Sequence, residues 1–112
     1  MGRSYIRMDE IPVLVLSGDI GATEVELARK SVLELMSNGK MKLLVELSAV
    51  EIMTSPGVGF MASLSHSYKS RGGRVVFVRP APFVREIMKV SGLLGLVEVQ
   101  ESMEEAEKVL TE

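Results

Sequence analysis

Apolar and polar residues follow two different periods along this chain. Five short runs rich in aliphatic residues are typical of β-strands: residues 5–8, 11–16, 43–47, 74–79 and 96–99. Between and after them, apolar residues recur at three- and four-residue steps, which predicts four helices in the order β-β-α-β-α-β-α-β-α. This alternation is typical of a mostly parallel sheet covered by helices. We therefore expect an α/β fold with a central sheet of about five strands and about four helices, a single domain over residues 1–112.

Local signals predict where the helices begin. Thr23 and Glu26 have the Thr-x-x-Glu spacing of a capping box at the start of the first helix. The pair Ser55-Pro56 favours a second helix in which Ser55 caps the free amides and Pro56 takes the first helical position. Ser102 is the predicted cap of the last helix.

Composition excludes several classes of protein. The 112 residues include no cysteine and one histidine, which rules out disulfides, thiolate nucleophiles and metal sites built on cysteines or paired histidines. Lys and Arg number 13 against 15 Asp and Glu, so the formal charge of −2 gives no basis for binding nucleic acid. No apolar run approaches the roughly 20 residues that cross a bilayer. We expect a cytoplasmic protein without cofactor, metal or direct membrane insertion.

Two patterns invite an enzymatic interpretation that their surroundings do not favour. Gly57 to Ala62 fits G-x-G-x-x-A, but about nine residues separate Leu47 from Gly57, whereas a dinucleotide site needs the turn directly after its strand. The favoured role of these glycines is close packing or a surface that must stay flat. His66 lies between two serines, yet no G-x-S-x-G motif surrounds it. We therefore expect no catalytic residues and no enzyme.

Ser55 differs from these patterns because of its position. At a helix start it lies at the positive end of the helix dipole, where added negative charge is tolerated. The following residues Pro56 to Met61 carry no charge and could form an apolar docking patch. A phosphate on Ser55 would bring almost two negative charges to that patch. From the residues alone, a simple capping serine remains the favoured interpretation.

Several short segments together point to a known family. The segments are Leu14–Ile20, Val45–Val50, Thr54–Gly59, Arg71–Gly73, and Val84 with Ser91–Leu93. In this order and spacing they resemble the STAS family of anti-sigma factor antagonists over nearly the whole chain. Asp19 matches the acidic residue of the family's early Gly-Glu/Asp-Leu turn. Thr54–Gly59 falls where the family carries Asp-Ser-x-Gly-Leu-Gly.

The resemblance implies a STAS-like domain that works as a regulatory switch and not as a catalyst. Ser55 takes the place of the phosphoacceptor serine. The partners implied are an anti-sigma factor that is also a serine kinase, and a serine phosphatase that resets the switch. The implied partner-binding residues are Thr54, Ser55, Pro56, Gly57, Val58 and Gly59.

This sequence departs from the family's pattern in two acidic positions. Thr54 replaces the aspartate before the acceptor serine, and Gly21 stands where a second aspartate is common. These losses favour an alternative function, an accessory STAS subunit of a membrane transport system that docks on a cytosolic ATPase and is never phosphorylated.

Overall fold

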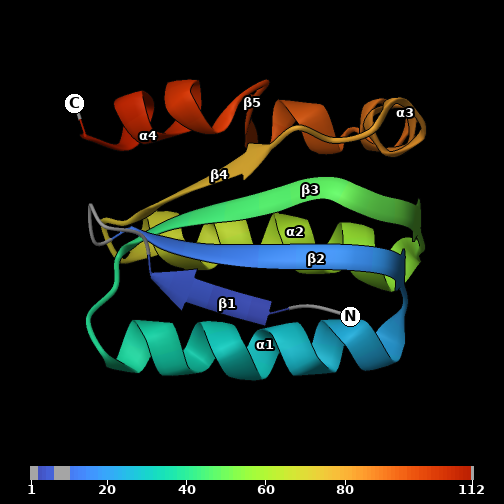
Figure 1. Cartoon of the computed structure of the whole chain (residues 1–112). Helices are drawn as coiled ribbons and strands as arrows, with labels where there is room; N and C mark the ends of the chain where they lie inside the picture. Colours follow the sequence, from blue (N-terminus) through green and yellow to red (C-terminus); the bar gives the residue numbers. More distant parts are fainter. Residues whose placement is uncertain (1–2, 7–10, 112) are drawn as a thin grey trace.

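The sheet is the centre of the fold, and its strands lie in the order β1-β2-β3-β4-β5 (Figure 1). The computed structural model describes residues 3–6 and 11–111. The strands are β1 Arg3–Ile6, β2 Pro12–Ile20, β3 Lys42–Met53, β4 Arg74–Val78 and β5 Glu98–Gln100. β1 pairs antiparallel with β2, and the other neighbours pair in parallel. The predicted mostly parallel sheet is confirmed, while residues 7 and 8 of the first predicted strand lie outside the described residues.

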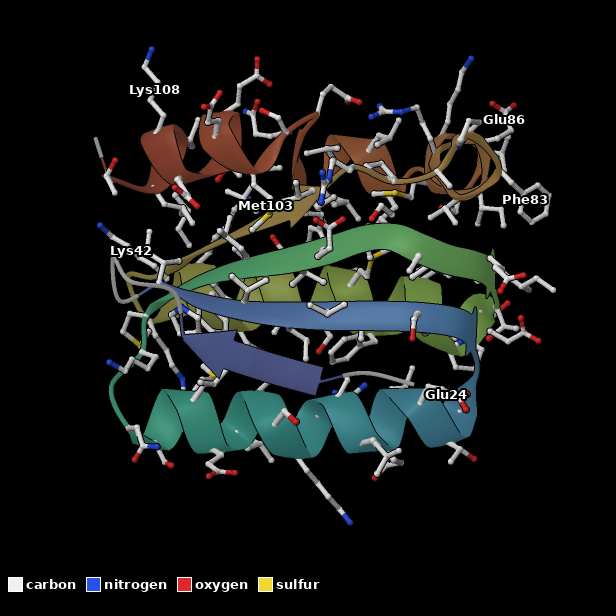
Figure 2. All side chains as sticks on the ribbon, viewed as in Figure 1. Glu24, Lys42, Phe83, Glu86, Met103 and Lys108 are labelled. Carbon is white, nitrogen blue, oxygen red and sulfur yellow. The ribbon has the colours of Figure 1, made fainter. Side chains whose placement is uncertain are left out.

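Helices follow the strands in the predicted order. They are α1 Ala22–Ser37, α2 Ser55–Ser70, α3 Pro82–Val90 and α4 Met103–Thr111, with a short 3-10 turn, η1, at Leu93–Gly95. The charged side chains of Glu86 and Lys108 point away from the sheet into solvent (Figure 2). The last strand forms at β5, two residues later than predicted at its start, because η1 precedes it.

Both faces of the sheet are buried, and β4 shows this most clearly. Val75 and Phe77 belong to the core that α1, α2 and α3 cover. Val76 and Val78 face the opposite way and pack in a second core with residues of α4. Alternation of this kind follows from the two-residue period of a strand, so β4 was predictable from sequence.

Strand β3 is longer than the sequence pattern predicted, and this length shapes the rest of the fold. β4 ends opposite Glu46, while β3 continues to Met53 with only β2 beside it. Ser48 and Ala49 in this extension are exposed, so the continuous apolar run that signalled the strand stops early. Helix α3 packs against β3.

The start of α1 corrects one prediction. The residue before the helix is Gly21, whose N–H donates a 2.9 Å hydrogen bond to Glu24 Oε1. This bond lowers the pKa of Glu24. The predicted capping box of Thr23 and Glu26 is wrong, because β2 runs to Ile20 and leaves only Gly21 to precede the helix. At α4 the prediction is confirmed, since the Glu105 N–H donates to Ser102 Oγ at 3.1 Å.

Tyr68 gives a prediction for alkaline pH. Its side chain is fully buried, and its hydroxyl makes no hydrogen bond within the part of the chain that the structure describes. Burial raises the pKa of Tyr68 to about 12 from 10.0. The unfolded chain therefore ionises first, and stability falls as pH rises from 10 toward 12.

We expect the free energy of unfolding of Tyr68→Phe not to show this fall. Between pH 7 and pH 11 it should therefore rise by about 1 kcal/mol relative to that of wild type. Urea unfolding at the two pH values measures it. Parallel pH profiles of the two proteins would contradict the expectation.

Candidate functional site

The site predicted from sequence lies where β3 passes into α2. Thr54 is the extended residue before the helix, and its side-chain Oγ1 donates a 2.9 Å hydrogen bond to the carbonyl of Ile20. Its backbone N–H bonds to the same carbonyl at 3.2 Å. Thr54 therefore ties the end of β2 to the start of α2.

Ser55 is the first residue of α2 and not its cap. The cap prediction is wrong by one residue, because β3 extends to Met53 and Thr54 alone connects it to the helix. Pro56 correspondingly lies at the second helical position. Ser55 is exposed, and its hydroxyl has no hydrogen-bond partner among residues 3–6 and 11–111. This leaves the oxygen accessible to a modifying enzyme.

The other residues predicted to bind a partner divide by exposure. Thr54, Pro56 and Gly59 are exposed, and Val58 is partly exposed. Gly57 is buried beneath them. A Cβ on Gly57 would lie 2.9 Å from Met53 Cγ, 3.1 Å from Ile20 Cγ2 and 3.2 Å from the Ile20 carbonyl oxygen. The packing role predicted for the glycine pattern therefore fits Gly57, whereas Gly59 faces open space.

A groove of about 270 Å³ opens beside Ser55, between the start of α2 and α3. It is lined by Met53, Thr54, Ser55, Val58, Ile87, Val90 and Ser91. None of these residues is charged. We call this feature the Ser55 groove.

Helix α3 continues the apolar surface away from the groove. Val84 and Met88 are buried under the helix, whereas Phe83 is 60% exposed and Val90 74%. Phe83, Ile87 and Val90 recur at four- and three-residue steps and so lie on one outer face, where Phe83 projects from the body of the molecule (Figure 2). We call these three residues the α3 stripe.

The α3 stripe was missed in the sequence analysis. A signal for it existed, because residues 83–90 carry two interleaved apolar stripes and one helix of this length can bury only one against a sheet. Which stripe faces inward depends on how α3 meets the extension of β3.

Asp19, the predicted match to the family's acidic turn, lies near the same edge of the sheet. It is exposed and pairs in register with Ile52, and its neighbour Ile20 pairs with Met53. The structure thus brings the ends of β2 and β3 together at the start of α2.

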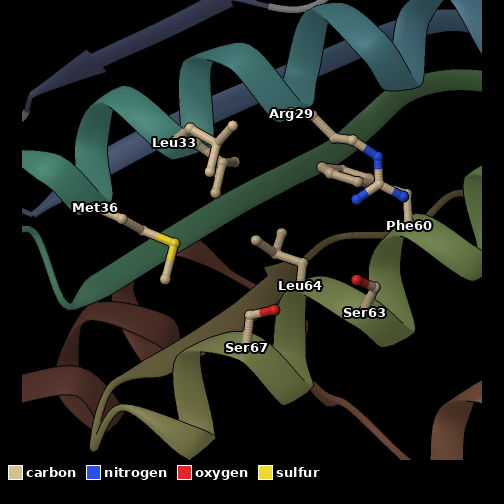
Figure 3. A pocket seen from close by; sticks show the side chains of 8 residues that line it. Arg29, Leu33, Met36, Phe60, Ser63, Leu64 and Ser67 are labelled. Atoms are coloured by element: carbon tan, nitrogen blue, oxygen red, sulfur yellow. The ribbon is translucent and has the colours of Figure 1, made fainter.

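Two larger hollows lie away from Ser55, one of about 540 Å³ beside His66 and Leu96 and one of about 340 Å³ beside Gly39 and Thr111. Between α1 and α2, a cavity of about 110 Å³ is bordered by the Arg29 guanidinium, which lies 5.5 Å from the centre of the Phe60 ring (Figure 3). Ligand pockets usually measure about 300–1,000 Å³, so this cavity is too small. His66 is exposed on α2, away from the Ser55 groove. Within the described residues, no three acidic or histidine side chains are grouped to hold a metal ion.

Comparison with known proteins agrees with this geometry. The family model of the STAS domain matches residues 5–106. The chain belongs to the STAS domain family. A relative from Thermotoga maritima, named as a candidate anti-sigma factor antagonist, is 25% identical over 103 residues, which cover 91% of each chain.

Solved structures share the fold of this STAS domain. A crystal structure of a candidate anti-sigma factor antagonist from Thermotoga maritima has a TM-score of 0.85 at 23% identity, covering 99% of this chain and 95% of the other. The phosphorylated form of SpoIIAA from Bacillus has a TM-score of 0.75 at 21% identity, covering 97% and 99%. The domain therefore has an anti-sigma factor antagonist-like fold. None of the helices in the described residues is both long and apolar enough to span a membrane.

The side-chain hydrogen bond from Thr54 to Ile20 in the STAS domain gives a prediction for stability. Thr54→Val keeps the branched shape but removes the hydrogen bond to Ile20, so we expect it to lower the free energy of unfolding by about 1 kcal/mol. Ser55→Ala removes a hydroxyl without a partner and should change it by less than about 0.5 kcal/mol. Urea unfolding compares the two variants. An equal or larger cost for Ser55→Ala would place the cap at Ser55.

Proposed function

We propose that this chain is a cytoplasmic anti-sigma factor antagonist that binds an anti-sigma factor serine kinase and is released when Ser55 is phosphorylated. It carries out no catalysis of its own, and a serine phosphatase resets it. One observation supports this proposal above the others. Ser55 is exposed at the start of α2, on the rim of an apolar groove lined by no charged side chain.

The proposed docking surface combines the Ser55 groove with the α3 stripe. Thr54, Pro56, Val58 and Gly59 surround Ser55 and offer an uncharged contact area. Apolar side chains as exposed as Phe83 and Val90 are the kind that a partner covers. The occupant we propose is the surface of the kinase around its own active site, since the same contact must bring Ser55 to the transferred phosphate.

Electrostatics explains how phosphorylation would end the complex. A phosphate adds about 1.5 to 2 negative charges, and covering them with an apolar partner surface costs several kcal/mol. In the free domain the phosphate faces water at the positive end of the α2 dipole, where it is tolerated. Phosphorylation therefore weakens the complex without unfolding the domain.

The missing family aspartate has a structural counterpart in this chain. Thr54 donates its hydroxyl hydrogen to the Ile20 carbonyl, which an ionised carboxylate cannot do. Threonine thus holds the start of α2 while Ser55 stays exposed. The exchange alters the charge next to the acceptor but leaves the acceptor in place.

The test is affinity capture from a lysate of the source organism, followed by addition of ATP and mapping of phosphorylated residues by mass spectrometry. Recovery of a serine kinase of the anti-sigma type, released by ATP with phosphate on Ser55, is the expected result. Capture of transporter subunits, with Ser55 unmodified, would overturn the proposal in favour of the transport-accessory function.

A further inference from the structure

An ion pair between a nearly buried carboxylate and a half-exposed guanidinium lies where β4 ends. The Glu46 side chain is 9% exposed, and its Oε2 accepts hydrogen bonds from Arg79 Nη2 at 2.6 Å and Nε at 3.1 Å. Its Oε1 accepts the Ser48 N–H at 2.9 Å. Burial alone would raise the pKa of Glu46, but the hydrogen bonds from Arg79 and Ser48 outweigh it and keep the pKa lowered. The carboxylate therefore stays ionised, and both of its oxygens accept hydrogen bonds.

The backbone of Arg79 is unusual. Its φ of 53° lies in the left-handed region, and within the described residues it is the one non-glycine residue with positive φ. Its N–H donates to the Gln100 carbonyl at 3.0 Å. Residues other than glycine rarely adopt this backbone conformation unless their surroundings hold them in it. The ion pair to Glu46 supplies such an anchor.

The segment after Arg79 leads directly into α3. Pro80 and Pro82 each fix their own φ torsion. Helix α3 begins at Pro82. A stiff connection of this kind transmits a displacement of Arg79 to the start of the helix. Val84 and Met88 hold the inner face of α3 in the core.

The point where the chain leaves β4 matters because α3, which follows it, forms one wall of the Ser55 groove. β4 ends opposite Glu46, and α3 packs against β3 and shares the groove with Met53, in the part of β3 that continues without β4. From there α3 contributes Ile87 and Val90 to the groove. A shift in the start of α3 would therefore change the width of the groove beside Ser55.

We propose that Glu46 and Arg79 are positioning residues, and that their ion pair sets the placement of α3 and with it the docking shape of the Ser55 groove. The importance of that shape for a partner rests on the proposed function. The placement itself is a property of this chain alone and is tested without a partner.

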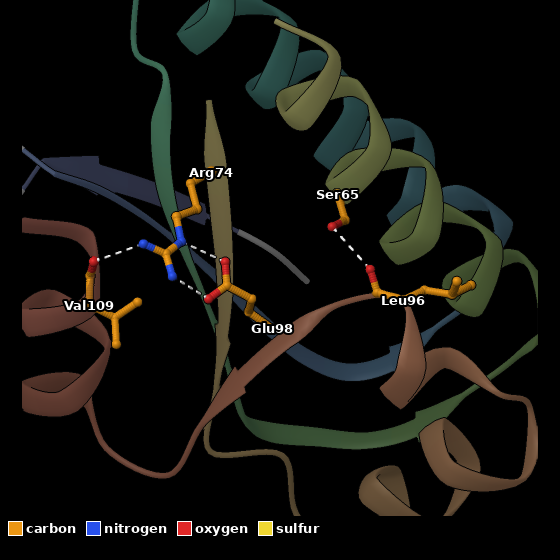
Figure 4. A network of polar contacts seen from close by, with 5 residues as sticks. All are labelled: Ser65, Arg74, Leu96, Glu98 and Val109. Carbon is orange, nitrogen blue, oxygen red and sulfur yellow. Dashed lines mark hydrogen bonds and ion pairs between the residues drawn. The ribbon is translucent and has the colours of Figure 1, made fainter. Parts of the chain in front are cut away.

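The chain offers a matched control at the other end of β4. Arg74 Nε and Nη2 donate to Glu98 at 2.6 and 2.7 Å, and Arg74 Nη1 donates to the Val109 carbonyl at 3.0 Å (Figure 4). This pair also joins β4 to a neighbouring element through two hydrogen bonds, but it lies at the end of the strand away from α3.

The experiment is a distance measurement by pulsed electron paramagnetic resonance. Because the chain has no cysteine, spin labels can be attached at Lys30→Cys in α1 and Lys89→Cys in α3, two exposed positions that belong to neither ion pair. We expect Glu46→Gln to shift and broaden the distance distribution between the labels, and Glu98→Gln to leave it unchanged.

Two outcomes would overturn the proposal. An unchanged distance in Glu46→Gln, even with a lowered melting temperature, would make the pair merely structural. An equal shift in Glu98→Gln would show that any ion pair on β4 has this effect. If Glu46→Gln does not fold, Arg79→Lys takes its place, since it keeps the charge and should produce a smaller shift. If only the proposed function is wrong, the affinity capture will recover no anti-sigma kinase, while Glu46→Gln will still shift the distance between the spin labels.

Discussion

Ser55→Glu should weaken binding to the purified kinase partner at least about 100-fold, measured by isothermal titration calorimetry. Glutamate places one charge on the rim of the Ser55 groove, where none of the lining residues is charged. Covering an ion with an apolar surface costs several kcal/mol, and about 2.8 kcal/mol already corresponds to 100-fold. Ser55→Ala adds no charge and should bind like wild type while resisting release by ATP.

The fold of Ser55→Glu should be unaffected, which makes the binding result interpretable. A carboxylate in the first turn of a helix is favoured by the dipole, by about 0.3–1 kcal/mol, so the melting temperature should not fall. Ser63→Glu, at an exposed position further along α2 and outside the groove, is the charge-matched control. Equal affinity of Ser55→Glu and wild type would place the docking surface elsewhere.

Gly57→Ala should lower the free energy of unfolding by about 1–3 kcal/mol, the usual cost of inserting a methyl group into a packed core. The new Cβ would lie 3.2 Å from the Ile20 carbonyl oxygen, which is backbone held by two hydrogen bonds from Thr54 and cannot yield. The Met53 side chain can move, but the start of α2 must also shift. Urea unfolding measures the loss.

Gly59→Ala is the matched control on the same helix. Its Cβ would meet nothing within 4 Å, and alanine in a helix interior is favoured over glycine by about 0.5–1 kcal/mol. We therefore expect opposite signs for the two substitutions. Equal losses at both positions would refute the packing role of Gly57 and indicate a general need for a flexible helix start.

Local patterns predicted the elements well, and particular residues show why. β4 could be predicted without knowing which strands pair with it, because both of its faces are buried and its apolar run is therefore continuous. Ser102 was found as a cap because serine there satisfies an amide three residues ahead. These features depend on neighbours in the chain alone.

Two helix starts were predicted incorrectly for a shared reason. Thr23 and Ser55 both have the chemistry of a cap, but β2 and β3 each extend further than their apolar runs. Strand length here is set by pairing between β2 and β3, whose register runs to Ile20 and Met53. Pairing between residues far apart in the chain left only Gly21 and Thr54 to precede the helices.

The sequence by itself determined the α/β order of elements, the absence of thiol chemistry and the placement of Ser55 at a helix start, because periodicity, composition and turn residues are local. Tertiary structure alone decided that Thr54 takes the N-cap position of α2, that Gly57 is buried and that the α3 stripe faces outward. It also brought Glu46 against Arg79. The first three depend on β3 continuing past the end of β4, whereas the contact of Glu46 with Arg79 depends on the register of β3 and β4. Both the length and the register follow from contacts between distant segments.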